Sequence, residues 1–292
     1  MRYDARVHAL DAFSSLSRST LWVFGLAIFV AFVFAFSTFV YLVVSFWQMR
    51  PHSEPRAIRN IVRDAWIELR VILKTQPFLL LYYMKGHLFG EGEGRPIIFV
   101  HGYFQNRIDF LFLAKEMRAA GLGPLYGFNY PWFLSVRANA KRLRGFIDRV
   151  CEERKCDSVD LVCHSLGGLV AVEVLQSESP KVHACVTIAS PHGGVAYRGP
   201  IVGKSGRDLR ATSKLVAAHA QTKLIVPFLS IYSSHDNVVF PARSSSLVAR
   251  GGRDHMIGEM PHLAILFSPE VAREAIHFLK DPQANQTAVV DV

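Results

Sequence analysis

Hydrophobic and polar positions follow three different patterns along this chain of 292 residues. Residues 21–47 hold no charged side chain and as a helix are long enough to cross a hydrocarbon core of about 30 Å. In residues 54–74 apolar side chains recur at helical spacing, with arginines and lysines between them. Beyond residue 95, apolar runs of strand length alternate with segments of helix length. The pattern predicts an apolar helix, an amphipathic helix and an α/β domain.

The apolar run predicts a transmembrane helix over residues 21–48, after an N-terminal tail over residues 1–20. Trp22 and Trp47 stand near its ends, where amphipathic rings favour the level of the lipid headgroups. A secretory signal peptide is the alternative, but the run exceeds the usual ~7–15 apolar residues and no small-residue cleavage site follows. We therefore expect a single-pass membrane protein. Arginines flank the run on both sides, so the side on which the main domain lies stays open.

Residues 49–94 are predicted to form a membrane-proximal amphipathic segment and a hinge. The apolar face of the helix can lie on lipid headgroups or pack against the following domain, and the pattern does not distinguish the two. The glycine-rich, charged run at residues 90–95 marks the end of this segment and a domain boundary.

Residues 95–282 are predicted to form one domain in which strands and helices alternate. Strands are expected at 96–102, 124–130, 158–163, 183–190, 228–234 and, as a shorter one, 245–250; helices are expected at 107–120, 136–155, 166–176 and 269–279. Such alternation is typical of a mostly parallel sheet with helices on both faces. The polar residues 283–292 are expected to be a flexible tail.

The net charge of +9 and the pI near 9.5 raise the question of a nucleic-acid partner. No helix-turn-helix, zinc-finger or RNP-like motif accompanies the basic residues, so an anionic membrane surface is the simpler explanation. The four cysteines lack the spacing of a metal or redox pair, and no metal or organic cofactor is expected.

Ser165 stands between a predicted strand and a predicted helix, within the sequence CHSLGG at residues 163–168. A nucleophilic serine at such a place needs a tight turn of the form G-x-S-x-G. Gly167 and Gly168 supply room after the serine, but Cys163 takes the first glycine position. Because cysteine is small, we expect the turn to form and Ser165 to be the nucleophile. The alternative is a buried strand and helix that happen to contain a serine.

A serine hydroxyl needs a base to take its proton, and the base needs an acid to orient it. In this arrangement both follow the serine, in the order acid and then histidine. Asp236, in the loop after the strand at 228–234, is the best-placed acid. His262, just before the last helix, is favoured as the base over His255, which has charged neighbours and can be a surface loop residue. His235, beside the acid, is assigned to loop structure.

Two backbone amides are expected to form an oxyanion hole. One belongs to Leu166 at the helix start. The other belongs to Tyr103, with Phe104 as the alternative, in the loop after the first strand, where Gly102 allows close approach. Residues 195–222, between the fourth and fifth predicted strands, can form a lid over an acyl pocket or a plain crossover helix.

The runs FVHGYFQN, LVCHSLGG, ASPHGG, YSSHDNVVFPARS and PHLAILFSPEV follow one another within residues 95–280. Together they resemble the alpha/beta-hydrolase superfamily, particularly bacterial lipases and related lipid deacylases. The resemblance implies the alpha/beta-hydrolase fold and a serine ester hydrolase with Ser165, Asp236 and His262 as its triad. Cys163 departs from the family pattern, which puts the rate in question more than the reaction class.

These observations predict a membrane-anchored serine hydrolase, a lipase or esterase of the bacterial inner membrane, that cleaves carboxylic esters through an acyl-enzyme. Its location favours a lipid or another hydrophobic acyl ester as substrate. The alternative is a non-catalytic membrane protein of hydrolase fold that binds a ligand or partner. Neither a nucleic acid nor a protein partner is identifiable, and the sequence does not specify acyl chain, head group or oligomeric state.

Overall fold

The computed structural model describes residues 18–53, 55–76, 88–177, 180–196, 198 and 202–283. Residues 1–17 and 284–292, which make up most of the two predicted tails, lie outside the described residues. The chain divides into two compact units, Met1–Val44 and Ser45–Val292. The domain limits drawn from the sequence stay a prediction.

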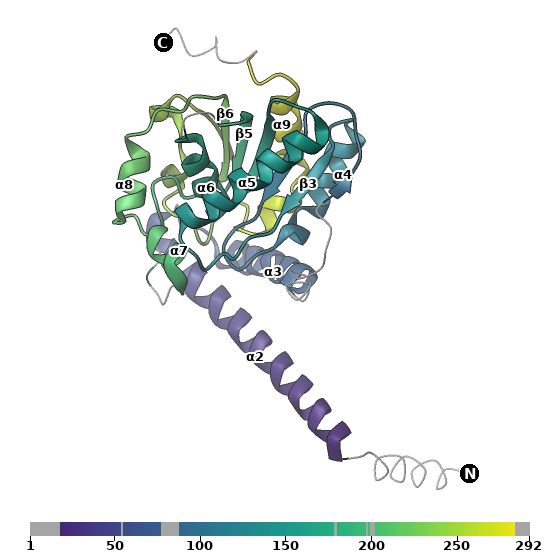
Figure 1. Cartoon of the computed structure of the whole chain (residues 1–292). Helices are drawn as coiled ribbons and strands as arrows, with labels where there is room; N and C mark the ends of the chain where they lie inside the picture. Colours follow the sequence, from purple (N-terminus) through teal and green to yellow (C-terminus); the bar gives the residue numbers. More distant parts are fainter. Residues whose placement is uncertain are drawn as a thin grey trace, which may run out of the picture. The chain divides into compact units, whose positions relative to one another are not determined.

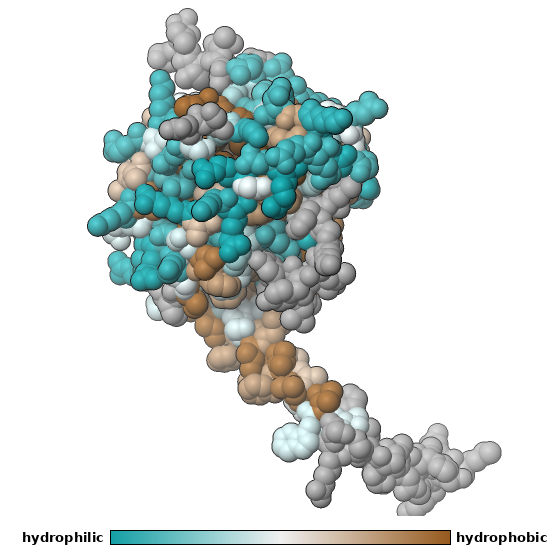
Figure 2. Space-filling view, viewed as in Figure 1, coloured by the Kyte–Doolittle hydropathy of each residue, from teal (hydrophilic) through white to brown (hydrophobic). Residues whose placement is uncertain are grey.

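Helix α2 (Arg18–Met49) has the length and composition of a membrane-spanning segment. The stretch Gly25–His52 has a mean hydropathy of 2.5, and 6% of its most apolar window is buried. Figure 2 shows the side chains of this helix as a largely brown, hydrophobic surface. The helix can therefore cross a membrane, and a signal sequence near the N-terminus has the same properties.

Helix α3 (Ile58–Thr75) follows the 3-10 turn η1 (Arg50–His52) and has an unusual distribution of faces. Its buried side carries polar as well as apolar residues, namely Asp64, Glu68, Val71, Ile72 and Thr75. Four apolar side chains are more than half exposed, namely Ile58, Val62, Trp66 and Leu73. The helix therefore packs on the domain through a face that includes two carboxyl groups, and it leaves an apolar stripe exposed.

Within the described residues, seven strands form one sheet in the order β1-β3-β2-β4-β5-β6-β7. Strand β1 pairs antiparallel with β3, whereas all the other pairs are parallel. The prediction of a mostly parallel sheet is confirmed. The strands are β1 (Leu88–Gly90), β2 (Ile97–Val100), β3 (Leu125–Phe128), β4 (Val159–His164), β5 (Val182–Ile188), β6 (Phe228–Ser233) and β7 (Arg253–Ile257).

Helices cover both faces of the sheet (Figure 1). On one face, α5 (Val136–Arg154) and α6 (Leu166–Leu175) share a core with Ile98 and Val100 of β2. On the other, Ile97 and Phe99 of the same strand belong to the core of α4 (Leu111–Ala119) and α9 (Pro269–Lys280). Successive strand residues point to opposite faces, so a strand buried on both sides must be apolar throughout.

The last strand of the sheet does not lie where the hydrophobic pattern predicts it. Residues 245–250 are not a strand, because they form the end of the 3-10 turn η4 (Ala242–Ser245) and the turn η5 (Val248–Arg250). The edge strand is instead β7, which pairs with β6. Four of its five residues are at least partly exposed, so it lacks the apolar run by which a buried strand is recognised.

The described residues of the segment 195–222 contain two short helices, α7 (Gly203–Asp208) and α8 (Lys214–Ala220), rather than one crossover helix. Helix α7 lies against the loop that follows β3. The amide of Lys204 donates to the carbonyl of Phe133 at 2.8 Å, and the amide of Val136 donates to Asp208 at 2.9 Å. Whether this segment acts as a lid stays a prediction.

Helix packing predicts opposite effects for two glycine substitutions. A Cβ atom at Gly167 would lie 2.3 Å from the carbonyl oxygen of Val100, whereas nothing lies within 4 Å of one at Gly145. We expect Gly167→Ala to lower the free energy of unfolding by about 1–3 kcal/mol through overpacking. Gly145→Ala, in the middle of α5, should raise it by about 0.5–1 kcal/mol. Urea unfolding of the solubilised protein measures both, and equal stabilities of the two variants would contradict this packing.

Candidate active site

Ser165 lies where β4 ends and α6 begins. Its backbone has φ 51° and ψ −120°, in a region that costs free energy for a residue with a side chain. Hydrogen bonds on both sides maintain this conformation. The amide of Ser165 donates to the carbonyl of Ile188 at 2.9 Å, and the amide of Gly168 donates to the carbonyl of Ser165 at 3.0 Å. The sharp turn places the serine at the carboxyl edge of the sheet.

Cys163 occupies the first glycine position of this turn without disturbing it. Its φ is not in the left-handed region, so the backbone does not require a glycine here. The side chain is fully buried, and the residue aligns with Val100 of β2 and Thr187 of β5. After the serine, Gly168 is needed, because a Cβ atom there would lie 2.3 Å from Oγ of Ser190.

The structure brings the predicted nucleophile, base and acid together. Oγ of Ser165 lies 3.0 Å from Nε2 of His262, and Nδ1 of His262 lies 2.8 Å from Oδ2 of Asp236. All three residues are buried, with Ser165 5% and His262 6% exposed. In this geometry the serine hydroxyl donates to Nε2, and the Nδ1–H group donates to the carboxylate.

The loop after β6 fixes the carboxylate of Asp236. Its Oδ1 atom accepts hydrogen bonds from the amides of Val238 and Val239, each at 2.8 Å. An aspartate that binds its own following backbone in this way stabilises a turn. The other oxygen, Oδ2, is therefore held toward His262.

The surroundings of His262 determine how readily it takes a proton. Burial by itself lowers the pKa of this imidazole, but the charge and hydrogen bond of Asp236, together with the charge of Glu68, outweigh burial and raise it above its ordinary value. A buried histidine that still accepts a proton has the property required of a general base.

The two other candidate histidines have different partners. His255 lies in strand β7 and not in a surface loop, and it faces α9, with Nε2 3.4 Å from Glu270 and Nδ1 3.8 Å from Glu274. Nδ1 of His235 lies 2.8 Å from Oγ of Ser234. The geometry thus favours His262 as the partner of the serine.

His101 and Tyr130 hold the loop that follows β2. The amide of Tyr130 donates to Nε2 of His101 at 3.2 Å, and Nδ1 of His101 donates to the carbonyl of Gly102 at 2.9 Å. Burial lowers the pKa of His101 to about 4, which keeps the ring neutral and able to make both bonds. The two rings stack at 4.2 Å. His101 thus orders the loop.

This loop and the start of α6 carry the expected oxyanion donors. The amide of Gly102 is already engaged, because it donates to Oε1 of Gln105 at 2.7 Å. The next N–H group in the loop is that of Tyr103. The amide of Leu166 is in the first turn of α6, where N–H groups have no partner inside the helix. The oxyanion role of Tyr103 and Leu166 stays a prediction.

Several polar residues at the site were not found from the sequence. Oε1 of Gln105 lies 2.6 Å from Nδ1 of His164, and Nε2 of His164 lies 3.0 Å from the carbonyl oxygen of His262. Oδ1 of Asn237 accepts from the amide of His262 at 2.9 Å, and Glu68 binds the residues that follow it. Gln105, His164 and Asn237 lie within motifs that point to the site, whereas nothing in the sequence connects Glu68 to it.

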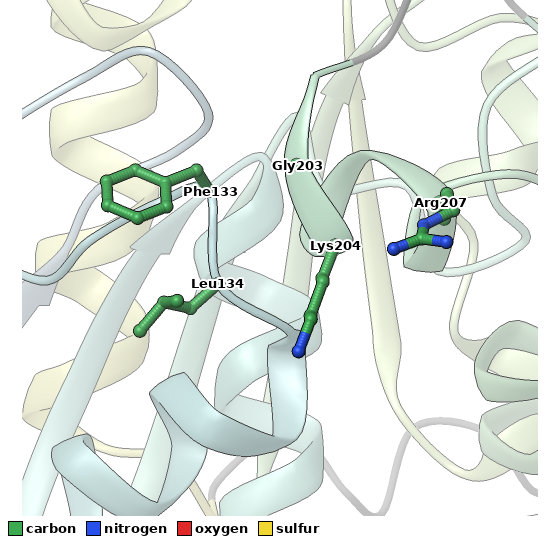
Figure 3. Close-up of a pocket in the computed structure, with 5 residues that line it drawn as sticks. All are labelled: Phe133, Leu134, Gly203, Lys204 and Arg207. Carbon is green, nitrogen blue, oxygen red and sulfur yellow. The ribbon is translucent and has the colours of Figure 1, made fainter.

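Two surface cavities lie beside the segment over residues 195–222. One, of about 420 Å³, is lined by Phe133, Leu134, Gly203, Lys204 and Arg207 (Figure 3). The other, of about 360 Å³, is lined by Gly193, Gly194, Ala196, Ala211, Phe240, Pro241, Arg243 and Ser244. Neither lining includes a residue of the predicted triad.

Among the described residues, no group of three or more His, Cys, Asp or Glu side chains is placed to hold a metal ion. The expectation of a reaction without metal or cofactor stays a prediction.

Comparison with known proteins agrees with the fold. A model of the alpha/beta hydrolase family matches residues 97–279. A Mycoplasma genitalium protein named "Putative esterase/lipase 2" is 26% identical over 196 residues, which span 60% of this chain and 70% of that protein.

Solved structures show the same fold at low sequence identity. The mature lipase BlEst2 of Bacillus licheniformis has a TM-score of 0.56 and 14% identity, over 66% of this chain and 96% of the lipase. A monoacylglycerol lipase of Paleococcus ferrophilus has a TM-score of 0.55 and 16% identity, over 67% and 97%. The family match begins after α2 and α3.

The buried position of Cys163 predicts the effect of restoring a glycine. We expect Cys163→Gly to lower the free energy of unfolding by about 1–2 kcal/mol, because buried side-chain atoms are lost and the unfolded chain gains freedom. The turn at Ser165 should persist, so the rate of labelling by a fluorophosphonate should be unchanged or higher. Urea unfolding and a labelling time course measure the two effects. A fall in labelling rate beyond about tenfold would assign the sulfur a role in the reaction.

Proposed function

Because the chain belongs to the alpha/beta hydrolase family, we propose that it is a membrane-anchored serine hydrolase that cleaves carboxylic esters. The observation that carries the proposal is the hydrogen-bonded series from Ser165 through His262 to Asp236. The esterase and lipase names of its relatives support the hydrolase class. Cys163, the feature that favours a non-catalytic protein, leaves the turn at Ser165 intact.

The proposed reaction is acyl transfer in two steps. Nε2 of His262 takes the proton of Ser165 as Oγ attacks the ester carbonyl, and the amides of Tyr103 and Leu166 stabilise the oxyanion. His262 then gives the proton to the departing alcohol, which leaves the acyl group on the serine. Water, activated by the same imidazole, releases the acid. Asp236 holds the imidazole in place and balances its positive charge.

A hydrophobic acyl ester, such as a lipid, is the proposed substrate. Tyr103, Phe104 and Trp132 form an aromatic cluster beside the expected oxyanion loop, with ring centroids 3.9–4.9 Å apart. Phe104 is 47% exposed, so the cluster offers an apolar surface, and it includes Tyr103, whose neighbour Gly102 lies close to Ser165. This surface suits the acyl chain of a lipid better than a polar substrate.

Attachment to a membrane, for which we propose the bacterial inner membrane, has two kinds of support. Helix α2 is long and apolar enough to span a bilayer. Helix α3 combines its exposed apolar stripe (Ile58, Val62, Trp66 and Leu73) with exposed basic residues, namely Arg59, Arg70 and Lys74. A helix with an apolar stripe beside a basic face is suited to lie in the headgroup region of an anionic membrane.

Substitution of the proposed triad tests the enzyme class. The full chain in detergent should react with a fluorophosphonate probe and hydrolyse p-nitrophenyl esters, and Ser165→Ala should abolish both. His262→Ala should lower kcat by about 10³-fold or more, because the serine loses its base. His255→Ala, on the edge strand, should keep the activity. A folded wild-type protein that neither labels nor hydrolyses would overturn the proposal, and a greater loss in His255→Ala would reassign the base.

Lipid contact of α3 can be measured through Trp66. The full chain is reconstituted into anionic vesicles with or without brominated phospholipid, which quenches tryptophan fluorescence at short range. The difference in emission between the wild type and Trp66→Phe isolates the fluorescence of Trp66. Brominated lipid should quench this fluorescence, because the apolar stripe is proposed to lie among the lipids. Trp22→Phe, in the proposed membrane-spanning helix α2, is the control for a residue that lies among the lipids. An unquenched Trp66 would place this face of α3 in water.

A further inference from the structure

We propose that Glu68 of helix α3 is a positioning residue for His262, so that the membrane-proximal helix completes the active site. The proposal rests on the proposed function of the Ser165, His262 and Asp236 series. It concerns a residue that precedes the part of the chain matched by the hydrolase family, residues 97–279.

The carboxylate of Glu68 accepts hydrogen bonds from the backbone immediately after His262. Its Oε1 accepts from the amide of Leu263 at 3.0 Å, and its Oε2 accepts from the amides of Leu263 at 3.1 Å and Ala264 at 3.0 Å. The residue is fully buried. Hydrogen bonds to an ionised carboxylate are stronger than those between neutral groups, so they restrain this stretch of backbone.

The amide of His262 itself is held from the other side. It donates to Oδ1 of Asn237 at 2.9 Å, and Nδ2 of Asn237 donates to Oγ of Ser45 at 2.9 Å. Side chains thus bind three successive amides, those of His262, Leu263 and Ala264. Glu68 binds the amides of Leu263 and Ala264. Asn237, which in turn contacts Ser45 near the end of α2, binds the amide of His262.

Helix α3 also engages the start of the same loop. The side chain of Arg56, just before the helix, pairs with Asp64 at 2.5 Å and with Glu259. Arg63 pairs with Glu259 at 2.9 Å. The loop from β7 to η6 (Ala264–Phe267) is therefore bound by this segment both before and after the proposed base.

A buried carboxylate is costly unless its oxygen atoms receive hydrogen bonds, so its presence in α3 calls for a reason. Burial, together with the charge of Asp236, raises the pKa of Glu68 above its usual value, although the amides of Leu263 and Ala264 and the charge of His262 act to lower it. Both oxygen atoms accept and neither needs to donate, which fits the ionised form. Meanwhile Trp66, two residues away, is 59% exposed. Packing alone would favour a buried Trp66 and an exposed Glu68, and such local conflicts mark functional positions.

The position of Glu68 also gives it an electrostatic effect on the imidazole. Its charge is among the influences that raise the pKa of His262, together with Asp236. When His262 takes the serine proton, two carboxylates would then stabilise the cation instead of one. Removal of the charge should make His262 less basic.

The test compares Glu68→Ala and Glu68→Gln in the full-length solubilised protein. Glu68→Ala should lower kcat for a p-nitrophenyl ester by about 10–100-fold with a smaller change in KM, because the base is misplaced rather than the substrate. Glu68→Gln keeps an acceptor oxygen and should restore most of the rate. Its loss of charge should move the acidic limb of the kcat/KM profile to lower pH, by about half a unit, since the base stays neutral at lower pH.

Asp160→Ala is the matched control. Asp160 is also a buried carboxylate, but it lies near the start of β4, away from Ser165, and pairs with His183 at 3.0 Å. This variant should lose stability without moving the acidic limb. Wild-type kcat and pH profile in both Glu68 variants would overturn the proposal. Equal losses of kcat in Glu68→Ala, Glu68→Gln and Asp160→Ala, with no shift of the limb, would overturn it as well.

Amide hydrogen exchange separates this proposal from the proposed function. If the wild type is inactive, the proposed function fails, yet amide exchange in residues 258–267 still tests whether Glu68 restrains the backbone there. Exchange there should quicken in Glu68→Ala and not in Asp160→Ala, and unchanged exchange would overturn the positioning role. If Glu68→Ala does not fold, Glu68→Gln decides the matter, through its pH profile in an active protein and its exchange in an inactive one.

Discussion

The strained backbone at Ser165 is the constraint on which the site depends. A positive φ at a residue with a side chain costs about 1–3 kcal/mol and persists only where the surroundings enforce it. Here the neighbouring strand accepts the serine amide through Ile188, and α6 begins directly after the turn. Since the sheet is parallel from β3 through β7, the loops after β4, β6 and β7 emerge at one edge. The geometry at Asp236 and His262 follows from that shared edge.

Burial alone does not decide the behaviour of the histidines around this turn. His101 and His164 are fully buried, and burial lowers the pKa of each, so both stay neutral and serve as fixed hydrogen-bonding groups. His262 is buried to a similar extent, but it binds Asp236 and is influenced by the charge of Glu68, and its pKa is raised. The position of charged partners therefore distinguishes a structural imidazole from one suited to proton transfer.

How much of this could be predicted depended on whether a feature was local in the chain. Buried strands such as β4 can be recognised in the sequence by continuous apolar runs, and the turn around Ser165 can be recognised by the glycines that follow the serine. Strand β7 does not, because an edge strand is partly exposed and need not be apolar. The expected order of acid and then histidine along the chain pointed to Asp236 and His262 as the candidates. Glu68 could not be found, since its partners lie about 195 residues away and only the folded chain brings them together.

The contacts of Ser45 and Glu68 have a consequence for where the catalytic unit begins. The family match starts at residue 97, which suggests cutting the chain there to obtain a soluble fragment. Such a fragment would keep every group of the proposed triad and still lack Ser45 and Glu68, which are proposed to hold its histidine in position. The proposed active length of this chain therefore begins at or before Ser45 and not at residue 97, where the family match starts.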